Sequence, residues 1–267
     1  MTSLEIAQVV ESAEALSMQD AYNALAAYRP EMGASVEVID GAVCGLLKTV
    51  PSPFFNRVLK LGIDQPASEG TVDRIRELFE RHDLPFAIQL SPFARPDTLK
   101  GWLAERGFVA TTNWVKLYRD VTTPPQIKTE LRIVQAGPSD RDLYGRVAAQ
   151  GYGAPDMLRP WFEAPMGRPG WTHYLAYDGD IAVSGAAMFV QGNCAALFGA
   201  ATVESHRGRG AQGALMVRRI RDAAELGCRW VVTETGEETE EEKNPSLHNM
   251  VRTGFQIAYT RPNFRIV

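Results

Sequence analysis

The chain has 267 residues, of which 45% are hydrophobic and 22% charged, with a formal net charge of −4. This composition supports a globular core and excludes intrinsic disorder, and the charge is too mild for a nucleic-acid surface. No apolar run approaches the ~20 residues of a membrane span. Residues 1–20 contain four acidic residues and no basic start, so we expect no secretory signal and no membrane partner.

The cysteines and histidines indicate neither disulfides nor a metal site. Cys44, Cys194 and Cys228 are far apart and lie in apolar stretches, whereas disulfide frameworks and zinc sites use dense or closely paired cysteines. We therefore predict buried thiols in a cytoplasmic protein. The four histidines show no HxH or HExxH spacing, so no metal is predicted.

The first half of the chain predicts a hairpin followed by alternating helices and strands. Strands are expected at 35–39, 43–50, 56–63 and 86–90, helices at 71–82 and 97–106, and an extended segment at 108–118. Paired prolines within 121–126 are typical of a linker. The predicted domains are therefore residues 1–123 and 124–267.

The second half predicts the order β-β-β-α-β-α-β. Strands at 172–177, 181–190 and 194–203 are joined by turns so short that neighbours must be antiparallel. Further elements are expected as a helix to about 226, a strand at 230–234, a helix at 245–253 and a strand at 255–260. Pro262 is expected to interrupt before a last extended piece at 264–267. In the long helix, Leu215, Ile220 and Ala223 should face inward, and Arg218, Arg219 and Asp222 should face water.

The two halves resemble each other in their closing elements. Each has a short helix that ends in a Gly-Phe step, and the two glycines, Gly107 and Gly254, lie 147 positions apart. An internal duplication is the simplest interpretation. A chance likeness of two α/β segments is the alternative.

The strongest chemical signal joins the third of these strands to the long helix. It consists of Arg207, Gly208, Arg209, Gly210, Ala211, Gln212 and Gly213. Glycines let the backbone approach a ligand, a helix start offers unpaired N–H groups, and arginines can bind phosphate oxygens. The segment predicts a pyrophosphate site; the alternative is a solvated loop with two surface arginines.

The same glycines also fit the dinucleotide pattern G-x-G-x-x-G, with Glu234 about twenty residues further on. Hairpin strands precede the loop, however, and only 33 residues follow Glu234. That is too little chain for the rest of a parallel dinucleotide-binding sheet, so we disfavour this interpretation.

At this loop the chain resembles the GCN5-related N-acetyltransferase (GNAT) superfamily, whose signature Arg/Gln-x-x-Gly-x-Gly/Ala holds the coenzyme A pyrophosphate. Arg207 and Gly210 match, and Gln212 departs from the final position. The resemblance covers residues 131–267 in element order. It implies an α/β (α+β) fold with a mixed, mostly antiparallel sheet flanked by helices. Residues 61–71 contain no Arg-x-x-Gly, so the first half resembles a degenerate copy, giving two related halves.

The resemblance implies transfer of an acetyl group from acetyl-coenzyme A to a primary amine of a small molecule or peptide. Backbone N–H groups at Ala201, Thr202 and Val203 would hold the thioester carbonyl and pantetheine. Glu234 is the candidate base, with an exposed strand-end carboxylate as the alternative.

The family's usual proton donor, a tyrosine four residues before the Gly-Phe step, is replaced by Met250. Tyr259, His248 or water would then serve as the acid. Asn244 and Asn249 fall where family members contact the coenzyme, although Asn244 could instead cap a helix. The replaced tyrosine also favours an alternative function, an inactive coenzyme-binding or interaction protein.

Two other segments have open interpretations. The acidic run at 237–242 is better explained as a solvated loop than as an attractor for a cationic amine. The stretch 151–170, with Tyr152 and Trp161, together with the adjoining Trp171, could form an acceptor-side lid or belong to the core.

Overall fold

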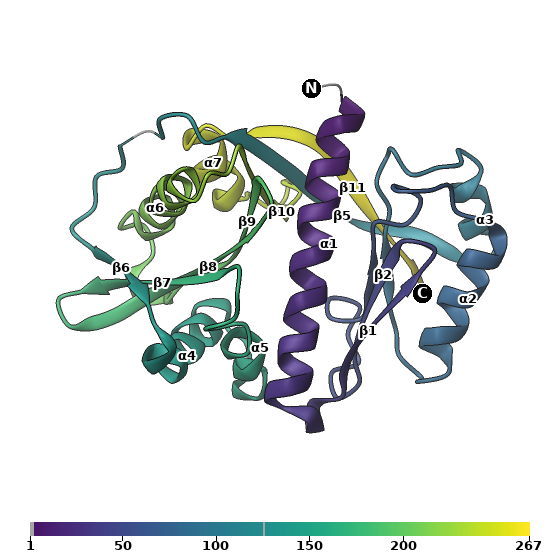
Figure 1. The fold of residues 1–267 in the computed structure, drawn as a ribbon, viewed down its shortest axis with the longest axis horizontal. Coiled ribbons are helices and arrows are strands. Elements are labelled where there is room, and N and C mark those ends of the chain that lie inside the picture. The colour runs from purple at the N-terminus through teal and green to yellow at the C-terminus, as the bar shows by residue number, and fades with distance from the viewer. Residues whose placement is uncertain (1–2, 125) are drawn as a thin grey trace. The chain divides into compact units, whose positions relative to one another are not determined.

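The computed structural model describes residues 3–124 and 126–267 (Figure 1). The predicted linker includes Pro125, which lies outside the described residues. The chain forms two compact units that do not follow a single cut in the sequence. Unit 1 comprises Met1–Lys116, Glu234–Thr239 and Ile257–Val267, and unit 2 comprises Leu117–Thr233 and Glu240–Gln256.

Unit 1 is a sheet covered by helices. Its strands follow the order β1 (Ala34–Ile39), β2 (Ala42–Leu47), β3 (Arg57–Leu59), β4 (Ala87–Gln89), β11 (Gln256–Ile266) and β5 (Phe108–Asp120). Its helices are α1 (Ser3–Tyr28), α2 (Glu69–Glu80) and α3 (Leu99–Glu105). The core beside α2 and α3 contains Val72, Ile75, Leu78 and Phe79, the predicted inward face of α2.

Unit 2 repeats this plan with strands in the order β5, β10 (Trp230–Gly236), β9 (Cys194–Thr202), β8 (Ile181–Gln191), β7 (Trp171–Asp178) and β6 (Arg132–Ala136). Its helices are α4 (Arg141–Tyr152), α5 (Arg159–Glu163), α6 (Ala211–Glu225) and α7 (Pro245–Arg252). Figure 1 shows α4 and α5 on one side of these strands and α6 and α7 on the other. Single 3-10 turns lie at Pro30–Met32, Pro138–Asp140, Asp156–Leu158 and Glu204–His206.

The two units share a pairing pattern. In unit 1, β1, β2 and β3 pair antiparallel and β4 is parallel to β3. In unit 2, β7, β8 and β9 pair antiparallel and β10 is parallel to β9. The predicted fold class, a mixed and mostly antiparallel sheet flanked by helices, is confirmed. The common pattern is what a duplication would produce, and the duplication itself stays a prediction.

The closing strands connect the two halves of the sequence. β11, from the end of the chain, pairs antiparallel with β4 of unit 1, so that Asn263 lies opposite Gln89. The expected break at Pro262 is wrong, because β11 continues through it. Proline lacks only the N–H donor, and the Pro262 carbonyl still accepts a hydrogen bond from the Leu90 N–H at 3.0 Å.

Two further differences from the sequence-based prediction concern unpredicted elements and the burial of one arginine. No element is predicted for residues 3–28, where α1 lies, nor for β6, α4 and α5. On α6, Leu215, Ile220 and Ala223 are buried as predicted, but Arg219 is only 2% exposed, so its placement toward water is wrong. All three cysteines are buried and free. In the described part of the chain, no helix has the length and apolar character to cross a membrane.

Candidate active site

The loop before α6 has a backbone that requires glycine. Gly208 and Gly210 adopt φ of +79° and +83°, in the left-handed region. At Gly210, a Cβ would lie 3.1 Å from the carbonyl oxygen of Lys128 and 3.4 Å from Cβ of Thr129. Both the torsion and the close approach therefore favour glycine at the position that the GNAT signature assigns to it.

The start of α6 has backbone donors that the helix itself does not pair, although Ala211 and Gly213 of its first turn are buried. The Ala214 N–H donates to the Gly210 carbonyl at 3.0 Å, so the three preceding helical N–H groups have no acceptor within the helix. Gly210 offers no capping side chain, and the first turn has no acidic residue. The positive end of the helix dipole lies at the same place. A pyrophosphate fits this arrangement of donors and charge.

The two arginines of the loop are held differently. Arg207 donates from Nη2 to the carbonyl of Gly151 at 3.2 Å, and thereby ties the end of α4 to the loop. Arg209 forms a two-pronged ion pair with Asp178, at 2.5 and 3.0 Å. Hydrogen bonds to Arg209 lower the pKa of Asp178. Because both side chains are more than a third exposed, this pair is weak and can exchange for an incoming anion.

The end of β9 is fixed from both neighbouring elements. The Ser184 hydroxyl donates to the Ala201 carbonyl at 2.7 Å and lies 2.9 Å from the Thr202 hydroxyl. The Val203 N–H donates to the carbonyl of Val183 at 2.9 Å. On the α4 side, a Cβ on Gly151 would come within 2.8 Å of the Ala201 Cβ, so only glycine fits there. The predicted carbonyl-holding segment is therefore rigid.

β9 also carries a bulge. Gly185 pairs with Ala201 but Ala187 pairs with Phe198, so one residue of β8 faces two residues of β9. One of the two, Gly199, has a φ of +60°. The extra residue redirects the backbone that follows it toward the end of the strand.

The first residues of β9 and β10 pair in parallel, and this pairing ends at Ala196 opposite Val232. One further contact, from the Thr233 hydroxyl to the Leu197 carbonyl at 3.3 Å, closes this stretch. From Phe198 onward, no pairing of β9 with β10 is found among the described residues. Backbone groups there can serve the amides of a pantetheine arm, which is the use that the GNAT resemblance implies.

The polar side chains predicted to contact the coenzyme are partly engaged within unit 2. Gln212 donates to the Ser246 hydroxyl at 2.6 Å and accepts from the Asn249 amide at 2.6 Å. Gln212 therefore joins α6 to α7. This contact is a structural role for the residue that departs from the GNAT signature. Asn244 accepts from the N–H groups of Ser246 and Leu247, at 3.0 and 3.1 Å, and caps α7.

The predicted base and acid belong to unit 1, whereas the glycine loop belongs to unit 2. Glu234 accepts at Oε2 from Lys116 Nζ at 2.8 Å and from Arg261 Nη2 at 3.0 Å. Its side chain is 14% exposed, so the alternative of an exposed strand-end carboxylate is not what the structure has. The carboxylate is one member of a buried ionic network.

The centre of this network is Arg261, which is fully buried on β11. Its guanidinium binds Glu14 at 2.6 and 2.9 Å, Glu11 at 2.9 Å and Gln89 at 2.7 Å. Burial alone would raise the pKa of Glu14, but Arg261 and Lys116 hold it well below its usual value. The network fastens α1 to the sheet of unit 1.

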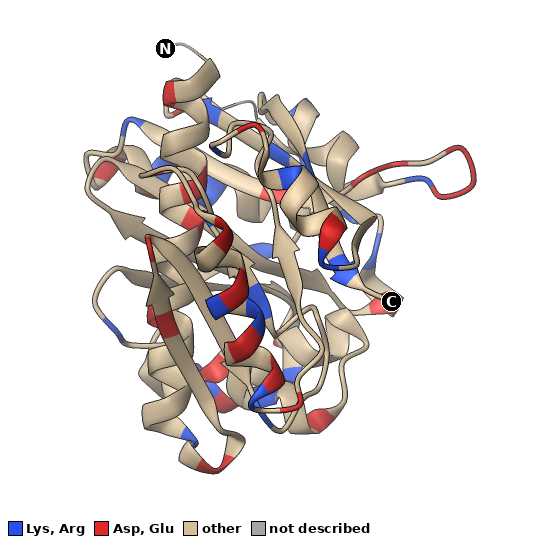
Figure 2. Ribbon diagram, turned by 90° about the vertical axis from the view of Figure 1, so that its right-hand side faces the viewer, with Lys and Arg blue, Asp and Glu red and all other residues tan. Residues whose placement is uncertain are grey.

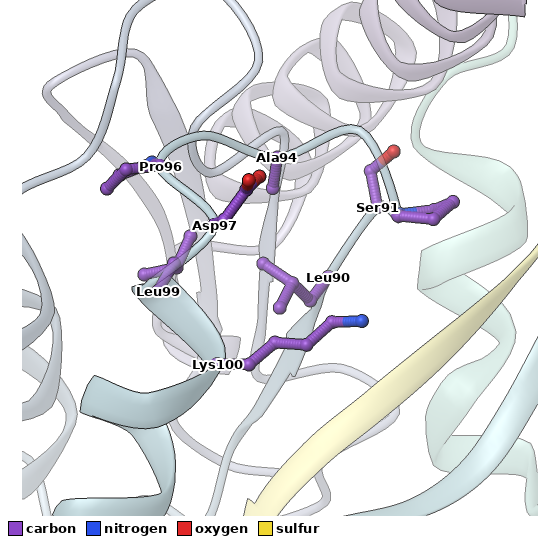
Figure 3. A pocket seen from close by; sticks show the side chains of 8 residues that line it. Leu90, Ser91, Ala94, Pro96, Asp97, Leu99 and Lys100 are labelled. Atoms are coloured by element: carbon purple, nitrogen blue, oxygen red, sulfur yellow. The ribbon is translucent and has the colours of Figure 1, made fainter.

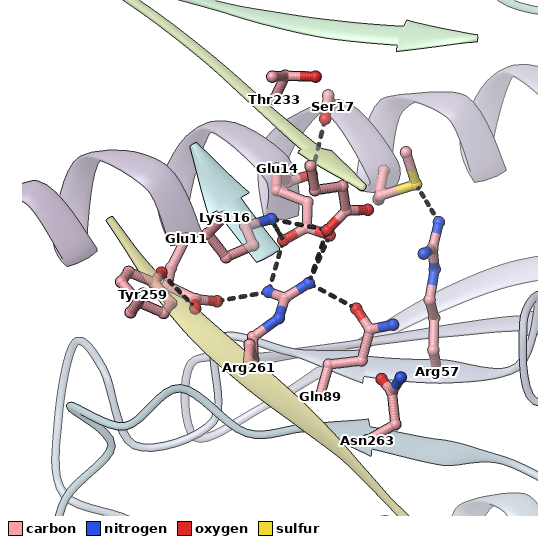
Figure 4. A network of polar contacts seen from close by, with 12 residues as sticks. Glu11, Glu14, Ser17, Arg57, Gln89, Lys116, Thr233, Tyr259, Arg261 and Asn263 are labelled. Atoms are coloured by element: carbon pink, nitrogen blue, oxygen red, sulfur yellow. Dashed lines mark hydrogen bonds and ion pairs between the residues drawn. The ribbon is translucent and has the colours of Figure 1, made fainter. Parts of the chain in front are cut away.

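Tyr259 belongs to the same network. Its hydroxyl donates to Glu11 Oε1 at 2.7 Å (Figure 4). Burial and the Glu11 carboxylate raise the pKa of Tyr259 far above its usual value, which makes proton donation to a thiolate unfavourable. At the position of the family tyrosine, Met250 is buried, and His248 is exposed on α7.

Sequence reasoning did not identify several residues that shape these segments: Gly151, Ser184, Asp178, Lys116 and the glutamates of α1. Asp178 was assigned only to a turn, and the others carry no local signal. Of the predicted lid residues, Tyr152 ends α4 and is exposed, Trp161 lies in α5 and Trp171 begins β7. The acidic run is mostly exposed and follows β10, where Figure 2 shows red gathered on one loop.

Unit 1 contains a cavity of about 210 Å³ at the end of β4, lined by Leu90, Ser91, Pro92, Ala94, Pro96, Asp97, Leu99 and Lys100 (Figure 3). None of the predicted site residues lines it. Among residues 3–124 and 126–267, no three His, Cys, Asp or Glu side chains form a group that could hold a metal ion.

Solved structures of other proteins have a fold similar to that of this chain. No protein-family model matches the sequence, and no curated protein does. A solved GCN5-related N-acetyltransferase from Kribbella flavida is similar, with a TM-score of 0.64 and 17% identity over 90% of this chain and 93% of that one. The chain has the fold of GNAT acetyltransferases.

Two further solved structures agree. A tandem GNAT protein from the clavulanic acid biosynthesis pathway, solved without AcCoA, has a TM-score of 0.60 and 18% identity, over 84% of this chain and 77% of that one. A GCN5-related N-acetyltransferase from Sphaerobacter thermophilus has a TM-score of 0.60 and 13% identity, over 84% and 79%. Sequence identities this low support a common fold only. The substrate and the activity have to be inferred from the site.

Proposed function

We propose that the protein is an acetyl-coenzyme A-dependent N-acetyltransferase that acts on a primary amine of a small molecule or peptide. One observation supports the proposal: the uncapped start of α6, behind the left-handed glycines Gly208 and Gly210, has three N–H groups without an acceptor in the helix and lies at the positive dipole end. The pyrophosphate of the coenzyme would bind there.

In this proposal the remaining parts of unit 2 orient the coenzyme. Arg207 holds the loop against the end of α4, and Arg209 exchanges Asp178 for a phosphate oxygen. The end of β9, at Ala201–Val203, presents backbone N–H groups to the thioester carbonyl, where negative charge develops during attack by the amine.

Proton transfer is assigned to two residues, and one variant tests each role. Glu234 is the proposed base and would act through Oε1, because Oε2 accepts from Lys116 and Arg261. Tyr259 is the proposed acid, against the raised pKa that its burial imposes. If Glu234→Gln and Tyr259→Phe both keep wild-type rates at every pH, solvent water carries these protons.

The direct test is release of free thiol from acetyl-coenzyme A, measured across a panel of primary amines and amine-bearing peptides. We expect amine-dependent release, and at least tenfold weaker coenzyme binding in Arg207→Ala. Arg221→Ala, an exposed arginine further along α6, is the matched control and should bind normally. Unchanged affinity in Arg207→Ala would remove the loop assignment.

A second function has its own support. Met250 stands where the family has its tyrosine, and Glu234 and Tyr259 are engaged in a buried network. These observations favour a coenzyme-binding or interaction protein without catalysis. Binding of acetyl-coenzyme A with no thiol release for any amine would decide for it.

A further inference from the structure

Arg219, in the middle of α6, is a buried cation without a carboxylate partner. Its side chain is 2% exposed, and burial lowers the pKa of Arg219 to about 10, so it remains charged near neutral pH. In the part of the chain that the structure describes, it forms no ion pair. The ionisable groups that act on it most are the hydroxyls of Tyr174, Tyr144 and Tyr152. The pKa values of Tyr174 and Tyr144 are raised by burial, so these two hydroxyls are neutral.

The guanidinium binds backbone carbonyls instead. Nε donates to Leu215 of its own helix at 3.1 Å, and Nη1 donates to Ala187 at 2.9 Å and to Phe198 at 3.2 Å. Ala187 and Phe198 lie directly opposite each other on β8 and β9, as the last regular pair before the bulge. One nitrogen atom therefore bridges both strands where the bulge begins.

This bridge has a consequence for the next peptide group. In a trans peptide the C=O and the following N–H point in opposite directions. Because the Phe198 carbonyl points to the guanidinium, the N–H of Gly199 points away from it. The bridge thus sets the direction of the first backbone donor in the bulge, and through it the course of the chain to Ala201.

A purely structural side chain would not need this charge. Burying a cation without a counter-ion is unfavourable, and only the carbonyls that it binds compensate for this here. The three carbonyls offset part of the desolvation, but a methionine would fill the same space without it. The charge is therefore better explained by what it does to the bulge.

We propose that Arg219 is a positioning residue for acetyl transfer: it fixes the bulge of β9 at a set distance from α6, so that coenzyme bound at the helix start meets correctly aimed backbone donors. The inference rests on the proposed function. Arg219 lies eight positions after the first residue of α6, about 12 Å along the helix axis, and so connects the two substrate-contacting segments of unit 2.

The test compares Arg219→Met with the wild type and with Arg221→Met, an exposed arginine on the same helix. We expect Arg219→Met to lower kcat at least tenfold, while its melting temperature is unchanged or higher and its Kd for coenzyme A changes less than threefold. Arg221→Met should match the wild type. A loss of kcat smaller than tenfold, or a loss accompanied by a lower melting temperature, overturns the proposal.

Arg219→Lys supplies a pH readout. A buried lysine loses its proton far more readily than arginine, so the ratio of variant to wild-type kcat should fall as pH rises. If the ratio of variant to wild-type kcat does not change with pH, the proposed role of the positive charge is wrong.

Hydrogen exchange separates this inference from the proposed function. If the wild type releases no thiol, the proposed function fails, and exchange still tests the bridge. We expect amides at 198–203 to exchange at least tenfold faster in Arg219→Met, with β7 unchanged. Unchanged exchange at 198–203, or faster exchange throughout unit 2, overturns the proposal.

Discussion

The starts of α2 and α6 occupy the same place in the two units and have opposite chemistry. At α2, the Ser68 hydroxyl accepts from the Thr71 N–H at 3.1 Å, the Thr71 side chain accepts from the Ser68 N–H at 3.1 Å, and the first turn contains Glu69. At α6, a left-handed glycine precedes uncapped N–H groups, and no acid follows.

The same position in the fold therefore does not by itself make an anion site. Both helices follow three antiparallel strands and lead into a parallel fourth. At α2 the capping box pairs the Thr71 N–H with the Ser68 hydroxyl, and the carboxylate of Glu69 opposes an incoming phosphate. Of these two helix starts, that of α6 has neither a side-chain cap nor an acidic residue in its first turn.

The buried charges differ in the same way. In unit 1, Arg261 is surrounded by carboxylates and by Gln89, whereas in unit 2 Arg219 binds only carbonyls. Arg261→Ala should lower the free energy of unfolding by about 3–5 kcal/mol, because it leaves buried carboxylates uncompensated. Urea unfolding measures this, with Arg265→Ala on the same strand as the control. A loss below 1 kcal/mol would contradict the assigned role of the network.

His173 in the core of unit 2 gives a pH-dependent prediction. Burial lowers the pKa of His173 from 6.5 to about 4, so between these values the unfolded chain binds a proton that the folded chain does not. Stability is full above pH 6.5 and falls as pH decreases toward 4, by about 3 kcal/mol in all. His173→Phe should lose this slope. The free energy of unfolding of each protein is measured against pH and expressed relative to its own value at pH 7.5. An equal slope in the wild type and in His173→Phe refutes the prediction.

Gly208 offers a matched pair of variants at the loop. Its φ is +79° and nothing lies within 4 Å of a Cβ there, and both Asp and Asn tolerate this region. We expect Gly208→Asp to weaken coenzyme A binding about tenfold more than Gly208→Asn, a difference of about 1.4 kcal/mol, because only the aspartate repels phosphate. Calorimetric titration of both variants measures it. Equal affinities would argue against an anion at this loop.

The smallest expected effect is at the corresponding helix of unit 1. Ser68→Ala should destabilise the protein by about 1 kcal/mol through loss of the cap and leave coenzyme affinity unchanged. Thermal unfolding and titration of the same sample test both parts. A weakened affinity would mean that unit 1 contributes to coenzyme binding.

Much of unit 2 could be predicted from the sequence, because its turns are short and locally encoded. The strands from Trp171 to Thr202 and the helix from Ala211 were located within one or two residues, and so was the glycine loop. Two left-handed glycines and a helix start are local features, which sequence patterns record well.

The rest depends on distant partners. α1 was missed because Glu11 and Glu14 interrupt its apolar face, and their burial depends on partners far along the chain, Arg261 above all. Tyr259 donates a hydrogen bond to Glu11, which lies 248 positions away in the sequence. Arg219 donates to carbonyls at a bulge. From the sequence alone, a charged residue is predicted to face solvent. The partners that allow its burial come from distant segments and are brought together only in the folded chain.

The central claim is that the chain binds coenzyme A once, at the start of α6. Hydrogen exchange with and without acetyl-coenzyme A, combined with calorimetric stoichiometry, tests it most directly. We expect one coenzyme per chain, with protection at residues 207–214 and none at 68–72. Absence of binding, a second bound coenzyme, or protection at 68–72 without protection at 207–214 would contradict it.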